Sequence, residues 1–332
     1  MKKNTQLGPT LSQISNAQGE LINRLIITPT LQAKSDRWSN ILPKKTNVFI
    51  KLELFQQSGS FKARGAFLAV NDLSPGQKKA GVVAASGGNH ALAVSWAASA
   101  AGVSAKIAMP KATDILRIEG CKASGAEVIL CRDIAESFEL MNSLAKKEDR
   151  AIIHPFDDAK MILGAATCAA EYVAQHPDID YFVIPVGGGG LISGMAAAIK
   201  KLKPTAIVVG VEPLGADGLY QSIKSGHPIT LQEVNTIADS LGAPMTLPLS
   251  FSIAQRFVDK VVRVSDEELL QSMMHYQEVL RITAEPACAA SLAAIIGPLR
   301  EEISGRTVGI LACGSNISLV RYDSLLKDFN IN

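Results

Sequence analysis

Residues 181–194 read YFVIPVGGGGLISG, an apolar run that passes through four consecutive glycines into an alanine-rich segment. The run predicts a buried strand over 181–186, and the following residues predict a helix through Ile199. Glycines at such a junction let backbone N–H groups approach an anion closely, and a helix start adds favourable partial charge. We therefore predict a phosphate-binding turn, formed by Gly187, Gly188, Gly189 and Gly190.

This glycine turn matches neither of the common nucleotide motifs. It lacks the Gly-Lys-Ser/Thr ending of a P-loop, and it does not have G-x-G-x-x-G spacing. Binding of a magnesium nucleotide or of a dinucleotide is therefore not indicated. The alternative to a phosphate site is a tight strand-to-helix turn without a ligand, which rarely needs four glycines in a row.

The same order of strand, turn and helix recurs along the chain. Strands are expected at 47–53, 81–86, 104–110, 126–131, 206–213 and 307–312, and helices at 90–101, 115–124 and 134–147. The strands read as apolar throughout, which is typical of parallel sheets covered by helices on both faces. We expect an α/β protein of two three-layer α/β/α domains with mostly parallel sheets and a ligand in the cleft between them. The predicted large domain comprises 1–74 and 158–332, and the small domain 75–157.

Composition excludes several classes of function. The chain has 332 residues, of which 47% are hydrophobic and 19% charged, and its net charge is +2 without a long basic run. We expect no nucleic-acid partner and no membrane-surface role. Five cysteines without a C-x-x-C pair favour free thiols in a reducing compartment. The first ten residues lack an apolar signal core, and no long apolar run occurs, so we expect a cytoplasmic protein without a membrane span.

A lysine and a second glycine turn add a candidate nucleophile and a candidate carboxylate-binding site. Residues 85–91, ASGGNHA, follow another apolar run, and their amides could hold a carboxylate, although a turn capped by Ser86 or Asn89 is the alternative. In QSGSFKARGA (57–66), Lys62 lies near a helix start, where burial and positive potential favour a neutral, nucleophilic amine. The phosphate-bearing aldehyde that forms a Schiff base with lysine is pyridoxal phosphate, which we expect as the cofactor.

Seven motifs in order resemble the fold-type II pyridoxal phosphate enzymes of the tryptophan synthase beta-like superfamily, and within them the serine/threonine dehydratase group. They are KLELFQQSGSFKARGA (51–66), ASGGNHA (85–91), HPFDD (154–158), PVGGGGLISG (185–194), GVEP (210–213), AEP (284–286) and CGSNIS (313–318). The resemblance runs from about residue 28 to 318. It implies removal of water from L-threonine or L-serine to give a 2-oxo acid and ammonia, in a homodimer.

The resemblance also implies roles for the cofactor site. Lys62 is the Schiff-base lysine and the base that removes the Cα proton, and Phe61 lies against the pyridine ring. Asn89 bonds the ring hydroxyl oxygen, and the four glycines hold the phosphate. Cys313 faces the pyridine nitrogen, where a neutral partner suits elimination. In the alternative alignment Ala312 takes that place, and the cysteine is a buried apolar filler.

For the substrate, the resemblance implies that its carboxylate is bound by one turn, which comprises Ser86, Gly87, Gly88, Asn89 and His90. Glu285 is implied near the ring edge or the substrate.

Three departures from the family pattern bear on the exact activity. Racemases of this group have a serine where this chain has Gly87, which disfavours a racemase. Several relatives bind a divalent cation after the Val-Glu-Pro strand. Here Glu212 fits that site but Gly218 replaces its aspartate, so we predict no metal, with Asp217 as an alternative ligand. The loop ADSLGAP (238–244) is unusual for threonine enzymes and is expected to border the substrate side chain.

The sequence leaves several alternative functions open. They are a serine or aspartate racemase, a hydroxyaspartate dehydratase, a β-replacement enzyme and a non-catalytic protein that carries pyridoxal phosphate. The intact set of Lys62, Asn89 and the four glycines argues against the last.

Overall fold

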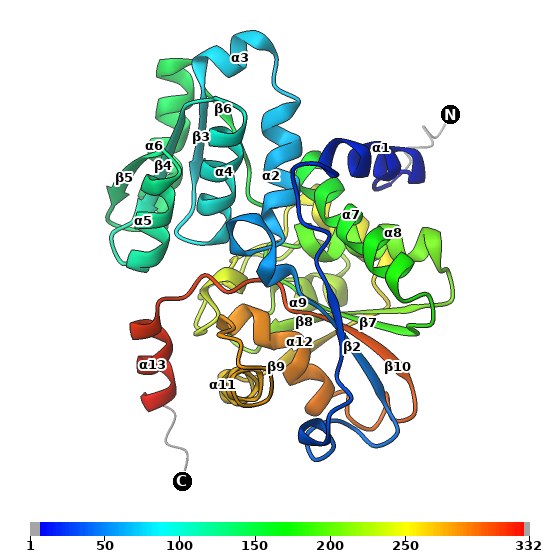
Figure 1. Cartoon of the computed structure of the whole chain (residues 1–332). Helices are drawn as coiled ribbons and strands as arrows, with labels where there is room; N and C mark the ends of the chain where they lie inside the picture. The colour runs from blue at the N-terminus through cyan, green and yellow to red at the C-terminus, as the bar shows by residue number, and fades with distance from the viewer. Residues whose placement is uncertain (1–6, 329–332) are drawn as a thin grey trace.

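The computed structural model describes residues 7–328 and contains two mainly parallel sheets (Figure 1). The larger sheet has the strand order β1-β2-β10-β7-β8-β9. Its strands are β1 (Thr30–Gln32), β2 (Asn47–Lys51), β7 (Tyr181–Pro185), β8 (Ile207–Pro213), β9 (Lys260–Val264) and β10 (Thr307–Leu311). Every neighbouring pair is parallel except β1 and β2, which are antiparallel.

The smaller sheet is parallel and has the order β5-β4-β3-β6. Its strands are β3 (Val82–Ala85), β4 (Ala105–Pro110), β5 (Glu127–Cys131) and β6 (Ala151–Ile152). Val82 and Ala84 pack into one apolar cluster, whereas Val83 and Ala85 pack with Met141 into another. Because successive side chains of a strand point to opposite faces, this sheet is covered on both sides.

Helices cover the sheets and connect their parallel strands. They are α1 (Leu11–Leu21), α2 (Lys62–Asn71), α3 (Pro75–Ala80), α4 (Asn89–Ala100), α5 (Ile115–Ala123), α6 (Ile134–Glu148), α7 (Ala159–Gln175), α8 (Gly190–Leu202), α9 (Gly218–Ser225), α10 (Pro248–Phe257), α11 (Asp266–His275), α12 (Pro286–Ile296) and α13 (Leu319–Asp328). Figure 1 shows α7 and α8 on one side of the larger sheet and α11 and α12 on the other. The predicted α/β architecture is confirmed.

The strands of the larger sheet fall within 1–74 and 158–332, and those of the smaller sheet within 75–157. The domain limits themselves stay a prediction, and residues 1–6 and 329–332 lie outside the described part of the chain. Helix α2 packs against both α4 and α7, so it links the two layered units. This position is important because α2 begins with Lys62.

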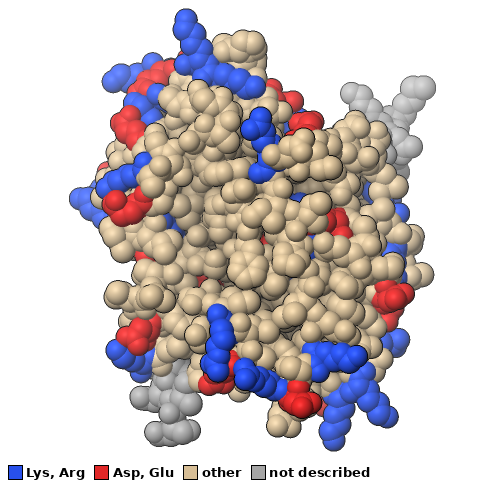
Figure 2. All heavy atoms as spheres, viewed as in Figure 1, with Lys and Arg blue, Asp and Glu red and all other residues tan. Residues whose placement is uncertain are grey.

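Two sequence expectations need correction. The strands are not apolar throughout, because Lys51 of β2 is fully buried. The short strands β1, β6 and β9 were also not expected. Figure 2 shows Lys, Arg, Asp and Glu mixed near the edge of one face, whose broad centre is uncharged. Between residues 7 and 328, no helix has the length and apolar character needed to cross a bilayer.

Candidate active site

Three turns of the site follow the carboxyl ends of parallel strands. The glycine turn follows β7 and leads into α8, the turn at 86–88 follows β3 and leads into α4, and residues 312–318 follow β10. Loops at the carboxyl ends of parallel strands are the usual place for ligands in α/β folds. The topology therefore brings together segments that are far apart in sequence.

The glycine turn has no room for side chains. Gly189 has a φ of +92°, which favours glycine. A Cβ at Gly188 would lie 2.4 Å from the ring of Phe156, and one at Gly190 would lie 2.6 Å from its carbonyl oxygen. The backbone of the turn is therefore not covered by side chains of its own.

Thr246 adds an observation that points to a ligand at this turn. Its side chain is buried, and its Oγ1 has no hydrogen-bond partner within residues 7–328. That oxygen lies 3.9 Å from the position that a Cβ of Gly189 would occupy. Buried hydroxyls are normally hydrogen-bonded, so an unpartnered one beside a glycine turn at a helix start fits a bound phosphate.

Lys62 is the first residue of α2, and its Nζ donates a hydrogen bond to the carbonyl oxygen of Pro155. Burial lowers the pKa of the amine to about 8, and the nearby Cys313 opposes this shift in part. Burial is thus the main cause of the low pKa. Because Pro155 precedes Phe156, which packs on Gly188, the amine and the glycine turn meet at one short segment.

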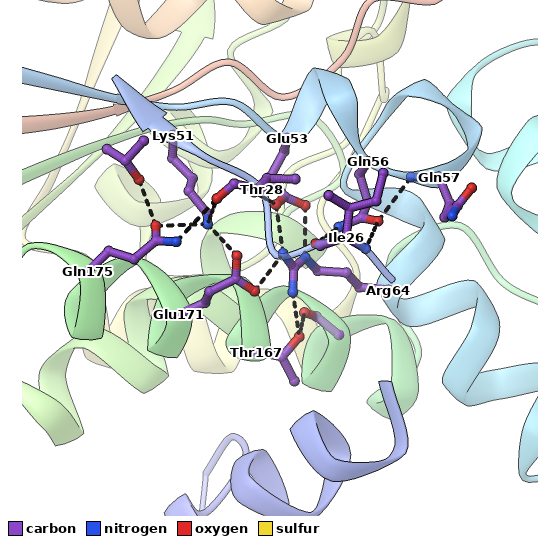
Figure 3. A network of polar contacts seen from close by, with 12 residues as sticks. Ile26, Thr28, Lys51, Glu53, Gln56, Gln57, Arg64, Thr167, Glu171 and Gln175 are labelled. Carbon is purple, nitrogen blue, oxygen red and sulfur yellow. Dashed lines mark hydrogen bonds and ion pairs between the residues drawn. The ribbon is translucent and has the colours of Figure 1, made fainter. Parts of the chain in front are cut away.

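A network of buried charged side chains connects α2 to β2 and α7, on the side of α2 that we call behind it (Figure 3). Arg64 donates to both carboxylate oxygens of Glu53, at 2.8 and 2.7 Å, and to Glu171 of α7 at 3.0 Å. Lys51 donates to Glu171 as well, and to the carbonyl oxygen of Thr28 at 2.8 Å. Two cations thus face two carboxylates, and the hydrogen bonds tie β2, α2 and α7 together.

The backbones of α2 and α7 also touch. A Cβ on Gly164 would lie 2.3 Å from the backbone nitrogen of Gly65, and a Cβ on Gly65 would lie 2.6 Å from Cα of Met161. Helices approach this closely only where side chains are absent. Since α7 begins soon after Pro155, this contact fixes the lysine helix relative to the carbonyl that accepts from Lys62.

Phe61 and Cys313 lie beside the lysine. The ring centroid of Phe61 is 5.3 Å from the Nζ of Lys62, and its backbone N–H donates to the carbonyl oxygen of Cys313 at 3.2 Å. Contact with Cys288 and burial raise the pKa of the Cys313 thiol well above its usual range, so the thiol is neutral. That Cys313 faces a pyridine nitrogen stays a prediction.

In the second turn, side-chain capping of α4 is not observed. The N-cap is Gly88, whose backbone N–H donates to Ser86 Oγ at 3.0 Å. The ring of His90 bonds the carbonyl oxygen of Ile153 at 2.8 Å, and burial lowers its pKa to about 3. The His90 side chain is therefore neutral and engaged away from the turn, and the backbone N–H groups of Gly87, Asn89 and His90 remain for a ligand.

Asn89 and Glu285 meet directly. Asn89 Nδ2 donates to Glu285 Oε1 at 2.5 Å, and Asn316 Nδ2 donates to Asn89 Oδ1 at 2.6 Å. Burial raises the pKa of Glu285 to about 7. A Cβ on Gly314 would lie 2.6 Å from Glu285 Oε1, so the strand end after β10 packs closely on this carboxyl. Two of the predicted cofactor residues, Asn89 and Glu285, are thus in direct contact beside the segment that follows β10.

Three further residues lie at this site, of which Asp239 belongs to the loop 238–244 that the sequence singles out, whereas Arg117 and Thr113 carry no sequence signal. Arg117 of α5 lies 3.3 Å from Glu285, and Asp239 pairs with Arg117. Thr113 has a buried Oγ1 without a partner in the described chain, 2.6 Å from the position that a Cβ of Gly87 would occupy. Arg117 and Thr113 are single residues without a motif, and only the fold brings them to the turn.

The region of the possible cation site is engaged by protein donors. Glu212 accepts from the backbone N–H groups of Leu219 and Tyr220, at 2.8 and 2.7 Å, and burial raises its pKa to about 8. Asp217 accepts from Arg263 at 3.0 Å. Across residues 7–328, no three His, Cys, Asp or Glu side chains form a group suited to a metal ion.

Comparisons with known proteins agree with this geometry. A family model described as "Pyridoxal-phosphate dependent enzyme" matches residues 24–314. The chain is 39% identical to phenylserine dehydratase of Ralstonia pickettii, covering 93% of each chain. It is 34% identical to L-threonine ammonia-lyase of Thermotoga maritima, covering 96% of this chain and 78% of that one. Maize serine racemase superposes with a TM-score of 0.89 at 32% identity, covering 97% and 98% of the two chains. The chain therefore belongs to the family of pyridoxal-phosphate dependent enzymes, in the fold-type II architecture.

Proposed function

We propose that this protein is a pyridoxal phosphate-dependent lyase that removes water from a 3-hydroxy amino acid, L-serine or L-threonine, to give a 2-oxo acid and ammonia. The observation that carries the proposal is the partly buried amine of Lys62, which has a lowered pKa of about 8 and donates to the segment that packs on Gly188. The unpartnered Thr246 hydroxyl at the same turn supports the fit of the phosphate. The bound cofactor supplies an electron sink for the charge that develops at the substrate Cα.

The protein groups divide the remaining work. Lys62 holds the cofactor aldehyde and, once released, removes the Cα proton, because an amine with a pKa of about 8 is partly neutral near pH 7. The N–H groups of Gly87, Asn89 and His90, which have no partner among the described residues, bind the substrate carboxylate at the start of α4. Cys313 would lie beside the pyridine nitrogen of the bound cofactor, and its neutral thiol would supply no charge there, which would suit loss of a leaving group.

Racemisation is the second candidate, and one observation favours it. Gly87 offers no side chain for proton transfer on a second face of the substrate. The Thr113 hydroxyl, however, is buried, lacks a partner in the described residues and lies where a side chain at position 87 would begin. A hydroxyl in that place could serve as a second proton carrier, and the names of similar proteins include both dehydratases and racemases.

The activity test is a substrate panel with purified holoenzyme. It includes both enantiomers of serine and threonine, threo-3-hydroxyaspartate and threo-3-phenylserine, each scored for 2-oxo acid and ammonia. A lyase releases both products without an added thiol, whereas a β-replacement enzyme needs one. Chiral chromatography of the remaining serine measures racemisation. Absence of product with every compound, with or without a thiol, would contradict the proposed reaction.

The cofactor linkage is tested separately. Reduction of the holoenzyme with borohydride followed by peptide mass analysis should place the reduced pyridoxyl adduct on Lys62. The variant Lys62→Ala should carry no adduct at that position. An adduct on another lysine in the wild-type protein would contradict the assignment of Lys62.

We also propose a homodimer in the cytoplasm. The broad uncharged centre of the face in Figure 2 supports a protein contact, because interface cores are depleted of charged residues. The five cysteines are all free and buried, as suits a reducing compartment. Light scattering on the purified protein should give a mass of two chains of 35.2 kDa, and a monomer over the micromolar range would contradict the dimer.

A further inference from the structure

Arg117 is a buried cation at the edge of the substrate turn. It donates from Nε to the carbonyl oxygen of Asn316 at 2.7 Å and from Nη1 to that of Gly87 at 3.1 Å. It also binds both carboxylate oxygens of Asp239, at 2.6 and 3.2 Å, and reaches Glu285 at 3.3 Å. A guanidinium group with this set of partners has a fixed position, since all its N–H groups are used.

Asp239 differs from the other partners because it lies at the surface. Its side chain is 62% exposed, whereas those of Arg117 and Glu285 are 4% and 1% exposed. It belongs to the 3-10 helix η4 (Asp239–Leu241), in the loop that the sequence predicts beside the substrate side chain. The ion pair therefore joins the buried cation to the solvent-facing border of the site.

The same loop lies over both ligand-binding turns. Ser240 Oγ is 3.4 Å from Asn89 Nδ2 and 3.6 Å from the position of a Cβ on Gly88. The carbonyl oxygen of Ser240 is 3.0 Å from the position of a Cβ on Gly187. A substrate whose carboxylate is bound at this turn therefore lies near this loop and near Arg117.

The charge balance at this place decides which side chains fit. With Asp239 present, the single positive charge of Arg117 is matched by one exposed carboxylate and by Glu285. Without it, Arg117 would face the substrate turn with Glu285 as its one carboxylate partner among these contacts. The N–H groups that now bind Asp239 would then be available to a second carboxylate of the ligand, because arginine binds carboxylates bidentately.

We propose that Asp239 is a specificity-determining residue, which occupies the bidentate binding position of Arg117 and adds a negative charge beside it, and so restricts the site to amino acids with uncharged side chains. A substrate or inhibitor with a second carboxylate is excluded because its binding partner is already occupied and a like charge lies next to it. The inference rests on the proposed function for the placing of the substrate carboxylate, and it names the substrate class of that site.

The test uses the holoenzyme and the variant Asp239→Asn, which keeps the size of the side chain and removes its charge. Binding of malonate, a dicarboxylate, and of propionate, a monocarboxylate, is measured by calorimetry. We expect malonate to bind at least tenfold more tightly to the variant, and propionate to change by less than twofold. The ratio of kcat/KM for threo-3-hydroxyaspartate to that for L-serine should also rise at least tenfold.

A matched control is Asp323→Asn, since Asp323 is 61% exposed and pairs with Lys327 on α13, away from the site. This control should leave all four measurements unchanged. If Asp239→Asn weakens or strengthens both acids equally, the ion pair only holds the loop in place, and the proposal is wrong. If no amino acid is turned over by the wild-type protein, the proposed function fails, yet the malonate and propionate results still decide the role of Asp239.

Discussion

Two of the buried charge groups within residues 7–328 differ in balance. One, behind α2, connects this helix to β2 and α7, and the other lies around Arg117 of α5, on the ligand side. Behind α2, Lys51 and Arg64 face Glu53 and Glu171, with the hydrogen bonds shown in Figure 3. On the ligand side, Arg117 faces two carboxylates, of which one is exposed, and the pKa of Glu285 is raised to about 7. Nearby, the amine of Lys62 is buried with a lowered pKa.

This difference indicates that one group stabilises the fold, whereas the other belongs to the ligand-binding site. The group behind α2 satisfies its own charges and therefore needs no ligand. The ligand side holds polar groups that the protein alone leaves unsatisfied, such as the Thr246 hydroxyl. Unsatisfied buried groups reduce stability and are retained where a ligand uses them. Variants on the two sides should therefore change stability in opposite directions.

The largest effect is expected behind the helix. Arg64→Met leaves Glu53 and Glu171 with one cation fewer in a buried place and should destabilise the protein by about 3–5 kcal/mol in urea unfolding. Arg132→Met is the control, because Arg132 is 77% exposed and pairs with Glu136, and it should change stability by about 0.5 kcal/mol or less. A loss below about 1 kcal/mol for Arg64→Met would contradict the view that the group behind α2 stabilises the fold.

On the ligand side, Lys62→Met should stabilise the cofactor-free protein, by about 2 kcal/mol at pH 7. The folded-state pKa of the amine is about 8 and its ordinary value is 10.5. Between these values the unfolded chain binds more protons, so stability of the wild-type protein rises with pH and the variant does not share this rise. Unfolding curves from pH 7 to 10.5 should therefore converge, and a difference independent of pH would contradict burial as the cause.

Thr246→Val should raise the stability of the cofactor-free protein slightly, by about 1 kcal/mol, because it removes a buried hydroxyl without a partner. It should also weaken retention of pyridoxal phosphate about tenfold in equilibrium dialysis. Thr167→Val is the matched control, since Thr167 Oγ1 donates to the carbonyl oxygen of Gly164 at 2.7 Å. That variant should lose about 1 kcal/mol, and equal signs for the two would remove the basis for a ligand at Thr246.

The smallest effect is expected at Asp239. Its ion pair with Arg117 is short, but the carboxylate is 62% exposed, so Asp239→Asn should change unfolding free energy by about 0.5 kcal/mol. If specificity changes with so little loss of stability, the Arg117–Asp239 pair determines substrate choice and contributes little to folding. A loss of several kcal/mol would instead make it part of the support, like the group behind α2.

Local patterns predicted the elements that carry the glycine turns. The strand expected at 181–186 is Tyr181–Pro185, and the helix after the glycines begins at Gly190. Here the apolar run and the glycines lie within a few residues of each other, so the neighbouring sequence contains all the information that the structure uses. The same holds for Lys62, which follows a Ser-Gly-Ser turn.

The charged groups could not be predicted in this way. The sequence predicts Lys51 as part of an apolar strand. Its burial as an ion pair could not be foreseen, because its partner Glu171 lies 120 residues further along the chain. Arg117 and Asp239 are 122 residues apart, and although the loop of Asp239 is singled out by the sequence, its pairing with Arg117 is not. Their energies depend on which segments fold together, and the spacing of residues in one segment does not contain that information.

The glycine contact between α2 and α7 has a mechanical consequence. With Gly164 against the backbone of Gly65, neither helix can slide along the other without a clash. The backbone at the start of α2, which carries Lys62, and the start of α7, which follows Pro155, are therefore held together by main-chain contact. A side chain added at either glycine would have to separate the two helices, and it would move the backbone of the catalytic lysine away from the glycine turn.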